Sequence, residues 1–315
     1  MCGIYGITEN NRGFIEKYID ICSHRGPDGR GIYNDDIITL GHNLLSITDN
    51  PKVSQQPWKT PAGNILIYNG EIFNYFELLE RYPAFIPKTT CDTELLAWGL
   101  DTYGLDFIDQ IDSMHGFAYY DPKKKELMLS RDHAGIKPVF YAEIGQGLVF
   151  GSEIKGMLDI VLGSRNVDNL SLSLMTQIGI NVSDHTFFSG IKKLLSGETL
   201  IYDIANKRIK SKKRIYIKPT SNHTFQKDEF ISQVKKTIKM SAIGNRPIGV
   251  FLSGGLDSSL VAYELYRLKG SLNTFTNRMN PNQRAPEDHN SDADAALKFA
   301  KQIGFNHQEI IITPQ

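Results

Sequence analysis

The second residue of the chain, Cys2, could act as an N-terminal nucleophile. A small residue after Met1 permits removal of the methionine, which would leave Cys2 with a free α-amine beside its own thiol. An α-amine has an ordinary pKa of about 7.7–8.0, so one residue would supply both the nucleophile and the general base. The alternative is an ordinary small residue at the start of a strand, and position 2 alone does not decide between the two.

An Asn-Gly pair at positions 69 and 70 could form an oxyanion hole. It lies in the stretch Tyr-Asn-Gly-Glu-Ile-Phe-Asn at residues 68–74. The Asn69 amide and the Gly70 N–H could donate hydrogen bonds to a developing tetrahedral oxyanion, each worth about 3–4 kcal/mol. Asn-Gly between apolar runs is also the strongest short hairpin signal, so a plain turn is the alternative.

Two shorter motifs also stand out, and each has a plain structural alternative, a surface turn for the first and a helix cap for the second. The stretch His-Arg-Gly-Pro-Asp-Gly at residues 24–29 predicts a tight turn, because proline fixes φ and glycine allows left-handed backbone. Asp92 follows Cys91 at the start of a predicted helix. Its carboxylate could cap that helix, or it could receive the α-ammonium of an amino-acid substrate.

A glycine turn between a predicted strand and a predicted helix indicates a phosphate site. Residues 250–259 read Val-Phe-Leu-Ser-Gly-Gly-Leu-Asp-Ser-Ser. Glycines let backbone N–H groups approach a phosphate, and a helix N-terminus adds anion affinity. The stretch is neither a Walker A loop, because the lysine of G-x-x-x-x-G-K-[ST] is absent, nor a G-x-G-x-x-G turn. A plain strand-to-helix turn is the alternative.

The elements that must position these residues fall into two parts, and the first part mixes strands with helices. Apolar runs predict strands, and 3.6-residue spacing predicts helices. The strands are expected at 37–40, 65–68, 116–120, 127–130 and 148–150, and the helices at 14–22 and 92–100. Strands joined by tight turns, with helices between them, favour a layered α+β domain over roughly the first 160 residues.

The second part begins after a stretch that reads as a connector, residues 163–222. That stretch contains a further strand pair at 200–202 and 214–216, with the charge run 207–214 between them as a solvated hairpin surface. From residue 223 the pattern becomes β-α-β-α-β, which indicates a parallel sheet. Its strands are expected at 248–252, 272–277 and 309–312, and its helices at 230–238, at 258–269 and after a capping box at Ser291 and Asp294.

Composition bounds the class of protein without indicating its chemistry. The chain has 315 residues, which favours two domains, and 35 basic against 35 acidic side chains, which argues against a general nucleic-acid binder. No apolar run is long enough for a membrane span, and the N-terminus lacks the features of a secretory signal. Three cysteines are too few for a disulfide framework or a four-ligand zinc site. The sequence therefore predicts a soluble, cytoplasmic protein.

Taken together, these motifs resemble the glutamine-hydrolysing asparagine synthetases. The resemblance is carried by the stretches at 1–4, 24–28, 69–74 and 253–259, and further by 131–138, 151–155 and 188–194. It implies a glutamine amidotransferase domain at 1–162, a connector at 163–222 and a partial ATP-pyrophosphatase domain at 223–315. The fold expected for the first domain is an α+β sandwich of the N-terminal-nucleophile type, with layers αββα. The second is expected to be an incomplete α/β parallel-sheet domain with a PP-loop.

The resemblance also implies substrates and residue roles. The Cys2 thiol would attack the amide of glutamine, with the oxyanion held by Asn69 and Gly70, and Glu71 and Asp92 would grip the α-amino end. ATP and Mg²⁺ would activate the β-carboxylate of aspartate as an acyl-adenylate, which ammonia then amidates. The residues implied in ATP binding are Leu252, Ser253, Gly254, Gly255, Asp257, Ser258 and Asn277, with Asp257 as the metal ligand and Asn277 near the adenine.

Two departures from the family pattern leave alternatives open. Leu44 stands where the pattern Arg-Leu-Ser-Ile has the arginine that clamps the glutamine α-carboxylate, which predicts weak use of glutamine or acceptance of another amide. The family's synthetase domain also continues well beyond the segment that 307–314 resembles, so a second chain could complete it. A different carboxylate acceptor, and a glutaminase or a nucleotide-sensing module of a split or degenerate synthetase, remain as alternatives. A homodimer is expected from the family, with a partner surface near Ile312.

Overall fold

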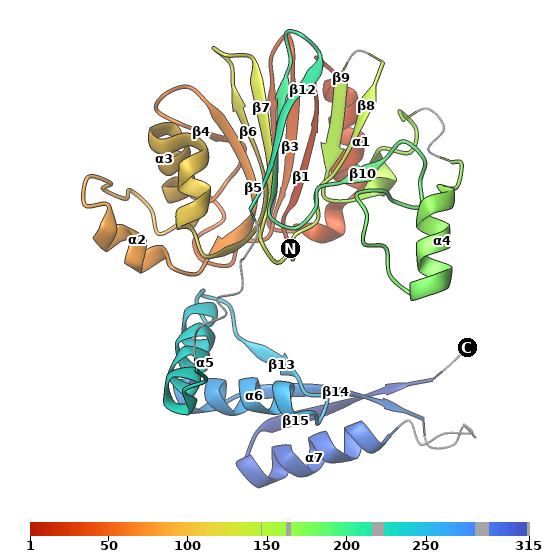
Figure 1. Ribbon diagram of the computed structural model, residues 1–315. Helices are drawn as coiled ribbons and strands as arrows, with labels where there is room; N and C mark the ends of the chain where they lie inside the picture. The colour runs from red at the N-terminus through yellow and green to blue at the C-terminus, as the bar shows by residue number, and fades with distance from the viewer. Residues whose placement is uncertain (146, 162–164, 216–223, 281–289, 314–315) are drawn as a thin grey trace. The chain divides into compact units, whose positions relative to one another are not determined.

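The computed structural model of the chain forms two compact units, residues 1–219 and 220–315 (Figure 1). The structure describes residues 1–145, 147–161, 165–215, 224–280 and 290–313. Among these residues, no helix combines the length and the apolar character that crossing a membrane requires.

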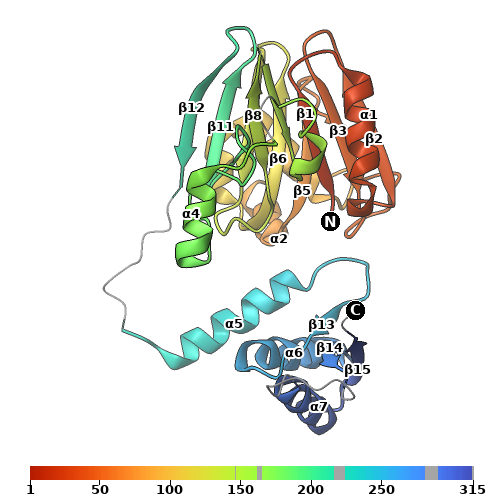
Figure 2. The same ribbon diagram turned by 90° about the vertical axis from the view of Figure 1, so that its right-hand side faces the viewer.

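Two six-stranded antiparallel sheets form the first unit, and helices cover their outer faces (Figure 2). In order across the first sheet lie β10 (Lys192–Lys193), β8 (Phe140–Ile144), β9 (Gly147–Gly151), β1 (Gly3–Ile7), β3 (Thr39–Leu44) and β2 (Gly29–Asn34). In order across the second lie β12 (Arg208–Arg214), β11 (Glu198–Asp203), β7 (Glu126–Arg131), β6 (Ser113–Asp121), β5 (Ile65–Ile72) and β4 (Trp58–Lys59). The longer helices are α1 (Arg12–Ile21) on the first sheet and α3 (Asp92–Tyr103) on the second, with α2 (Tyr75–Arg81) and α4 (Asn169–Ile178) besides. Three short 3₁₀ helices span Ser23–Arg25, Gly104–Gln110 and Ile154–Gly156. The predicted αββα sandwich is therefore confirmed.

Alternating apolar residues fill the space between the sheets, as their period of two predicts. Ile4 and Leu40 from one sheet pack into the same buried cluster as Ile67 and Leu129 from the other. On the outer face of the first sheet, α1 buries Ile15, Tyr18 and Ile19, which the helical period places on one side. The helix begins after Asn11, whose side chain accepts a hydrogen bond from the N–H of Phe14 at 3.1 Å.

The segment 163–222, read from the sequence as a connector, contributes strands to both sheets. β10 pairs with β8, β11 pairs with β7, and β12 pairs with β11. The charge run that was expected in a hairpin between strands is itself β12. As an edge strand it exposes its lysines, which discourages pairing with another chain. The predicted strand at 214–216 runs into residues outside the described part of the chain.

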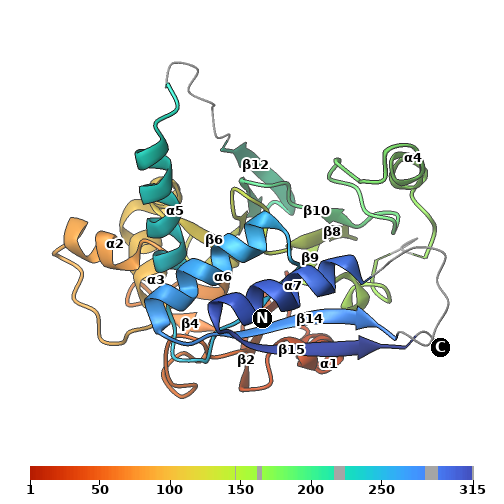
Figure 3. The ribbon, with the colours of Figure 1, turned by 90° about the horizontal axis from the view of Figure 1, so that it is seen from below.

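The second unit is a three-stranded parallel sheet with its helices (Figure 3). Its elements are α5 (Lys227–Ser241), β13 (Gly249–Phe251), α6 (Leu256–Lys269), β14 (Asn273–Met279), α7 (Ser291–Ile303) and β15 (Asn306–Ile312), and the strand order is β13-β14-β15. The predicted β-α-β-α-β pattern matches these elements. The predicted capping box is wrong, because Asn290 is the N-cap residue of α7 and makes no side-chain capping bond, and Ser291 is already helical. The Asp294 carboxylate instead accepts a hydrogen bond from Arg278 at 2.7 Å.

Apolar side chains of the helices pack on one face of this sheet, while several apolar side chains of the strands are exposed. Leu252, Leu265, Ala296 and Phe305 share a core with neighbouring apolar residues from the helices. Phe251 is 76% exposed, and Ile310 and Ile312 are 46% and 39% exposed. Right-handed crossovers between adjacent parallel strands place α6 and α7 on the same face, so these exposed residues belong to the uncovered part of the sheet.

Candidate functional site

Cys2 lies in a pocket of the first unit that five segments build. The pocket is lined by residues of the N-terminus, the turn after β3, the segment 54–56, the end of β5 and the start of α3, with Met114 and Lys137 besides. The predicted residues Cys2, Leu44, Asn69, Gly70, Glu71 and Asp92 all line it. Residues far apart in the sequence are thus brought to one site, because β1 and β5 belong to the two facing sheets.

Hydrogen bonds on both sides of Cys2 hold it in place. The Leu45 N–H donates to Cys2 Sγ at 3.3 Å, and Arg25 Nε donates to the Cys2 carbonyl oxygen at 2.9 Å. Arg25 is itself buried and pairs with Glu153 at 3.1 Å. The motif at 24–29 is therefore more than a surface turn, because it braces the backbone of the candidate nucleophile. Burial raises the pKa of the Cys2 thiol, and the Leu45 N–H, the N-terminal amine and Lys137 oppose that rise.

Asn69 and Gly70 lie inside β5, so the hairpin alternative for this pair is excluded. In β5 they pair with Gly116 and His115 of β6. A Cβ on Gly70 would lie 2.4 Å from the Met114 carbonyl oxygen, so the strand needs glycine there. Asn69 is 1% exposed, and its Nδ2 is a buried donor with no partner among the described residues. An unpaired buried donor is costly, and here a ligand oxygen could satisfy it.

Two buried carboxylates, Glu71 and Asp92, share the pocket. Asp92 does not cap α3, because Cys91 is the N-cap residue and Asp92 Oδ2 accepts hydrogen bonds from the Ile72 N–H at 3.0 Å and the Tyr68 hydroxyl at 3.1 Å. Glu71 Oε1 is buried without a partner in the described structure. Burial raises the pKa of both carboxyls, and the Asp92 charge raises that of Glu71 further. A ligand ammonium would satisfy the unpaired oxygen and offset the repulsion between the two carboxylates.

Leu44 ends β3 beside Gly29 and leaves an apolar wall in the pocket. It is 3% exposed, and Leu45 and Ile47 continue this wall. The only basic side chain among the described residues that line the pocket is Lys137. The sequence patterns do not single out Lys137. The signal that could have found it is its place in the stretch 131–138, which resembles the family pattern.

The Ser-Gly-Gly turn of the second unit follows β13 and leads into α6. Gly254 adopts φ +76°, and a Cβ there would lie 2.7 Å from the Asp292 carbonyl oxygen, so the turn requires glycine. Ser253 Oγ lies 2.9 Å from Ser258 Oγ, which braces the turn across the helix start. Gly255 is the N-cap residue of α6 and offers no side-chain cap, so the first N–H groups of the helix remain available to an anion.

The other residues predicted for ATP binding lie outside the glycine turn itself, in the core, in a strand and in a helix. Leu252 is a core residue, 1% exposed, so only its backbone could face a ligand. Asn277 lies within β14, two residues before its end, and is exposed. Asp257 lies in the first turn of α6. No group of three or more His, Cys, Asp or Glu side chains that could hold a metal ion occurs among the described residues.

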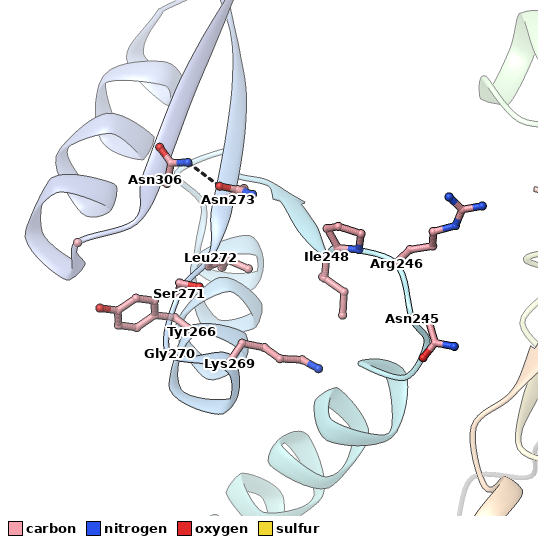
Figure 4. Close-up of a pocket in the computed structure, with 12 residues that line it drawn as sticks. Asn245, Arg246, Ile248, Tyr266, Lys269, Gly270, Ser271, Leu272, Asn273 and Asn306 are labelled. Carbon is pink, nitrogen blue, oxygen red and sulfur yellow. Dashed lines mark hydrogen bonds between the residues drawn. The ribbon is translucent and has the colours of Figure 1, made fainter. Parts of the chain in front are cut away.

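The second unit also has a surface pocket at the amino-terminal ends of its strands, away from the Ser-Gly-Gly turn (Figure 4). Its lining residues precede β13 and β14 or lie around the start of β15, whereas the Ser-Gly-Gly turn follows β13. Asn306 Nδ2 donates to Asn273 Oδ1 at 2.6 Å between the two strand starts (Figure 4). Because ligands of open parallel sheets bind at the carboxyl ends of the strands, this pocket is not the expected nucleotide site.

Comparison with known proteins agrees with this geometry. Residues 1–216 match the glutamine amidotransferase domain family, and residues 229–315 match the asparagine synthase family. The chain is 31% identical to a putative glutamine-hydrolysing asparagine synthetase 2 of Methanocaldococcus jannaschii, over 83% of this chain and 56% of that protein. It is 27% identical to glutamine-hydrolysing asparagine synthetase B of Escherichia coli, over 100% of this chain and 55% of that protein. The chain thus spans about half the length of these relatives.

A solved structure supports the fold. The allosteric regulatory enzyme of purine biosynthesis superposes with a TM-score of 0.50 at 15% identity, covering 100% of this chain and 68% of that one. At this identity the likeness concerns the fold alone. Three findings point to one family: the cysteine at position 2, the Asn-Gly pair within β5 and the family match over residues 1–216. The chain belongs to the glutamine amidotransferase domain family.

Proposed function

We propose that the first unit hydrolyses glutamine at Cys2 and that the ammonia serves an ATP-dependent amidation of aspartate. The observation that carries the first half is the unpaired Asn69 Nδ2, buried beside Gly70 in the pocket of the cysteine. Oxyanion stabilisation needs such preorganised donors. Support for the second half is the Ser-Gly-Gly turn before α6 and the similarity of residues 229–315 to asparagine synthases.

In this proposal the Cys2 amine, freed by removal of Met1, takes the thiol proton as Sγ attacks the amide carbon. The carbonyl electron pair moves to oxygen, where Asn69 Nδ2 and the Gly70 N–H donate. Collapse of the tetrahedral species breaks the C–N bond, and the amine returns its proton to the leaving nitrogen, which departs as ammonia. Water then hydrolyses the γ-glutamyl thioester to glutamate and the free thiol. Glu71 and Asp92 hold the α-ammonium throughout.

For the second unit, we propose that the 253–258 segment binds the phosphates of ATP and that Asp257 contacts Mg²⁺ through water. The exposed N-terminus of α6 and the glycine turn fit this role. ATP would supply an adenylate leaving group for the aspartate β-carboxylate, with release of pyrophosphate. We further propose that a second polypeptide or a second copy covers the exposed Phe251 and Ile310. The proposed location is the cytoplasm, where these metabolites occur.

Two assays on the purified chain test the two halves. Wild type should release ammonia from glutamine, and Cys2→Ala should not, while both keep the same thermal unfolding midpoint. Equal ammonia release from the two proteins would refute the nucleophile. Pyrophosphate release with ATP and aspartate, measured with and without the neighbouring gene product, tests the synthetase half. Ammonia release without pyrophosphate release would identify the chain as a glutaminase only. Release of neither product would favour a nucleotide-sensing module.

A further inference from the structure

Lys137 is a buried cation that the proposed mechanism does not use. It is 6% exposed and lines the pocket together with Cys2, Asn69 and Glu71. Its ammonium has no hydrogen bond or ion pair among the described residues, in contrast to Lys155 and Lys192, which pair with Glu153 and Asp184. The ammonium thus lacks a protein partner among the described residues, and an anion that forms in the pocket could supply one.

The loop between β7 and β8 fixes where this lysine points. The Lys137 N–H donates to Asp132 Oδ2 at 2.9 Å, and its carbonyl oxygen accepts from Arg131 Nε at 3.0 Å. Asp132 is fully buried, and its other oxygen accepts from the Ile136 N–H at 2.9 Å. Because its oxygens are used by backbone donors, Asp132 holds the loop rather than pairing with the ammonium. The lysine side chain is left to enter the pocket.

The candidate partner of this lysine is the Cys2 thiol, because both residues line the same pocket. Burial and the Arg25 charge lower the pKa of Lys137, and Cys2 comes first among the groups that oppose that fall, before Asp132 and Glu71. Lys137 in turn lowers the pKa of the Cys2 thiol, although less than the Leu45 N–H and the N-terminal amine do. The other charged groups that act on the Cys2 thiol are the N-terminal amine and Asp92. A carboxylate anchor for the far end of a substrate would be expected beside Leu44 and Ile47, on the apolar wall, rather than against Sγ.

We propose that the Lys137 ammonium stabilises the thiolate of Cys2 and is a catalytic residue of the glutaminase site. The inference rests on the proposed role of Cys2 as the nucleophile. An opposite charge within about 4–6 Å lowers an acid's pKa by about 1–3 units. Lys137 would therefore keep a reactive fraction of thiolate in a pocket whose burial otherwise favours the thiol. The negative charge passes from Sγ to the substrate oxygen on attack, and the ammonium remains close to both.

The test measures thiolate directly, without any need for turnover. Iodoacetamide alkylation of Cys2 is followed by peptide mass over pH 6–10, with Cys2→Ala as the blank. In Lys137→Met the alkylation profile should move to higher pH by at least about one unit, a roughly tenfold slower reaction at neutral pH. Lys137→Arg, which keeps the charge, should restore most of the rate, and the exposed Lys192→Met should match wild type. Lys137→Gln serves in the same way if the methionine variant unfolds at a lower temperature.

Steady-state kinetics separate this role from simple substrate binding. The proposal predicts that Lys137→Met lowers kcat for ammonia release about tenfold or more and leaves KM for glutamine within about threefold. An unchanged alkylation profile with a raised KM would overturn it and would assign Lys137 to the substrate carboxylate. If wild type releases no ammonia, the proposed function fails, yet the alkylation profile still decides whether Lys137 stabilises the thiolate.

Discussion

Replacing Leu44 with arginine should convert the apolar wall of the pocket into an anion site. Leu44 ends β3, lines the pocket with Cys2 and is 3% exposed. Its partner across the strands is Gly29, and the Leu44 Cβ lies 3.6 Å from where a Gly29 Cβ would stand. The missing side chain at Gly29 leaves space on this face, so the longer arginine can turn toward the pocket opening.

The expected magnitude follows from one charge-assisted hydrogen bond to the glutamine α-carboxylate. Such a bond contributes about 1.5–3 kcal/mol, which corresponds to about a 10- to 150-fold change in affinity. In wild type the described residues lining the pocket offer a single basic side chain, Lys137, to which we have assigned a role at Cys2. We therefore expect wild type to have a high KM for glutamine and Leu44→Arg to lower that KM by a factor in this range, with little change in kcat.

The assay is ammonia release over a range of glutamine concentrations, with glutamine and an α-carboxamide analogue compared in parallel. The arginine should improve glutamine and leave the uncharged analogue unchanged, because only the carboxylate gains a partner. Leu44→Met is the control for side-chain length without charge, and Leu44→Lys replaces arginine if that variant is unstable. A low-millimolar KM in wild type that the arginine leaves unchanged would refute the reasoning.

Two further predictions concern stability. Burial and the Asp92 charge raise the pKa of Glu71, so the folded protein favours the protonated carboxyl. The folding stability that depends on this proton is present below the ordinary carboxyl pKa and is lost as pH rises through the raised pKa. Glu71→Gln should therefore raise the thermal midpoint increasingly with pH between 5 and 9, unlike the exposed control Glu80→Gln, and a pH-independent difference would contradict this. Gly254→Ala should destabilise the second unit by about 1–2 kcal/mol or more in urea unfolding, because φ is +76° and the Cβ meets backbone at 2.7 Å. Gly255→Ala, whose nearest contact would be 3.4 Å and whose φ is −74°, should cost clearly less, mainly because alanine is a weaker helix N-cap, and equal losses would remove the argument.

Much of the fold could be predicted from local patterns, because they report which faces are buried. The strand at 65–68, the helix opening at Asp92 and the parallel order of the second unit follow from apolar spacing and turn residues. The charge run at 207–214 could not be assigned in the same way. Its strand conformation comes from pairing with β11, and a sequence that is polar on both faces carries no period to reveal it.

The motifs of the candidate site were likewise visible in the sequence, whereas their meaning depended on tertiary neighbours. Asn-Gly is a hairpin signal locally, and only pairing with β6 makes it the middle of a strand with a buried, unpaired amide. Asp92 stands where a residue could cap its helix, and only the tertiary structure brings the Tyr68 hydroxyl and the Ile72 N–H to its carboxylate.

The sequence by itself determined which residue types are available for chemistry: a cysteine at position 2, the Asn-Gly pair and the Ser-Gly-Gly turn. The tertiary structure alone decided which charges face one another. Lys137 is about 135 residues from Cys2 in the chain (137 − 2 = 135), and no periodicity or spacing connects them. They line the same pocket because Lys137 follows β7 of one sheet and Cys2 precedes β1 of the facing sheet.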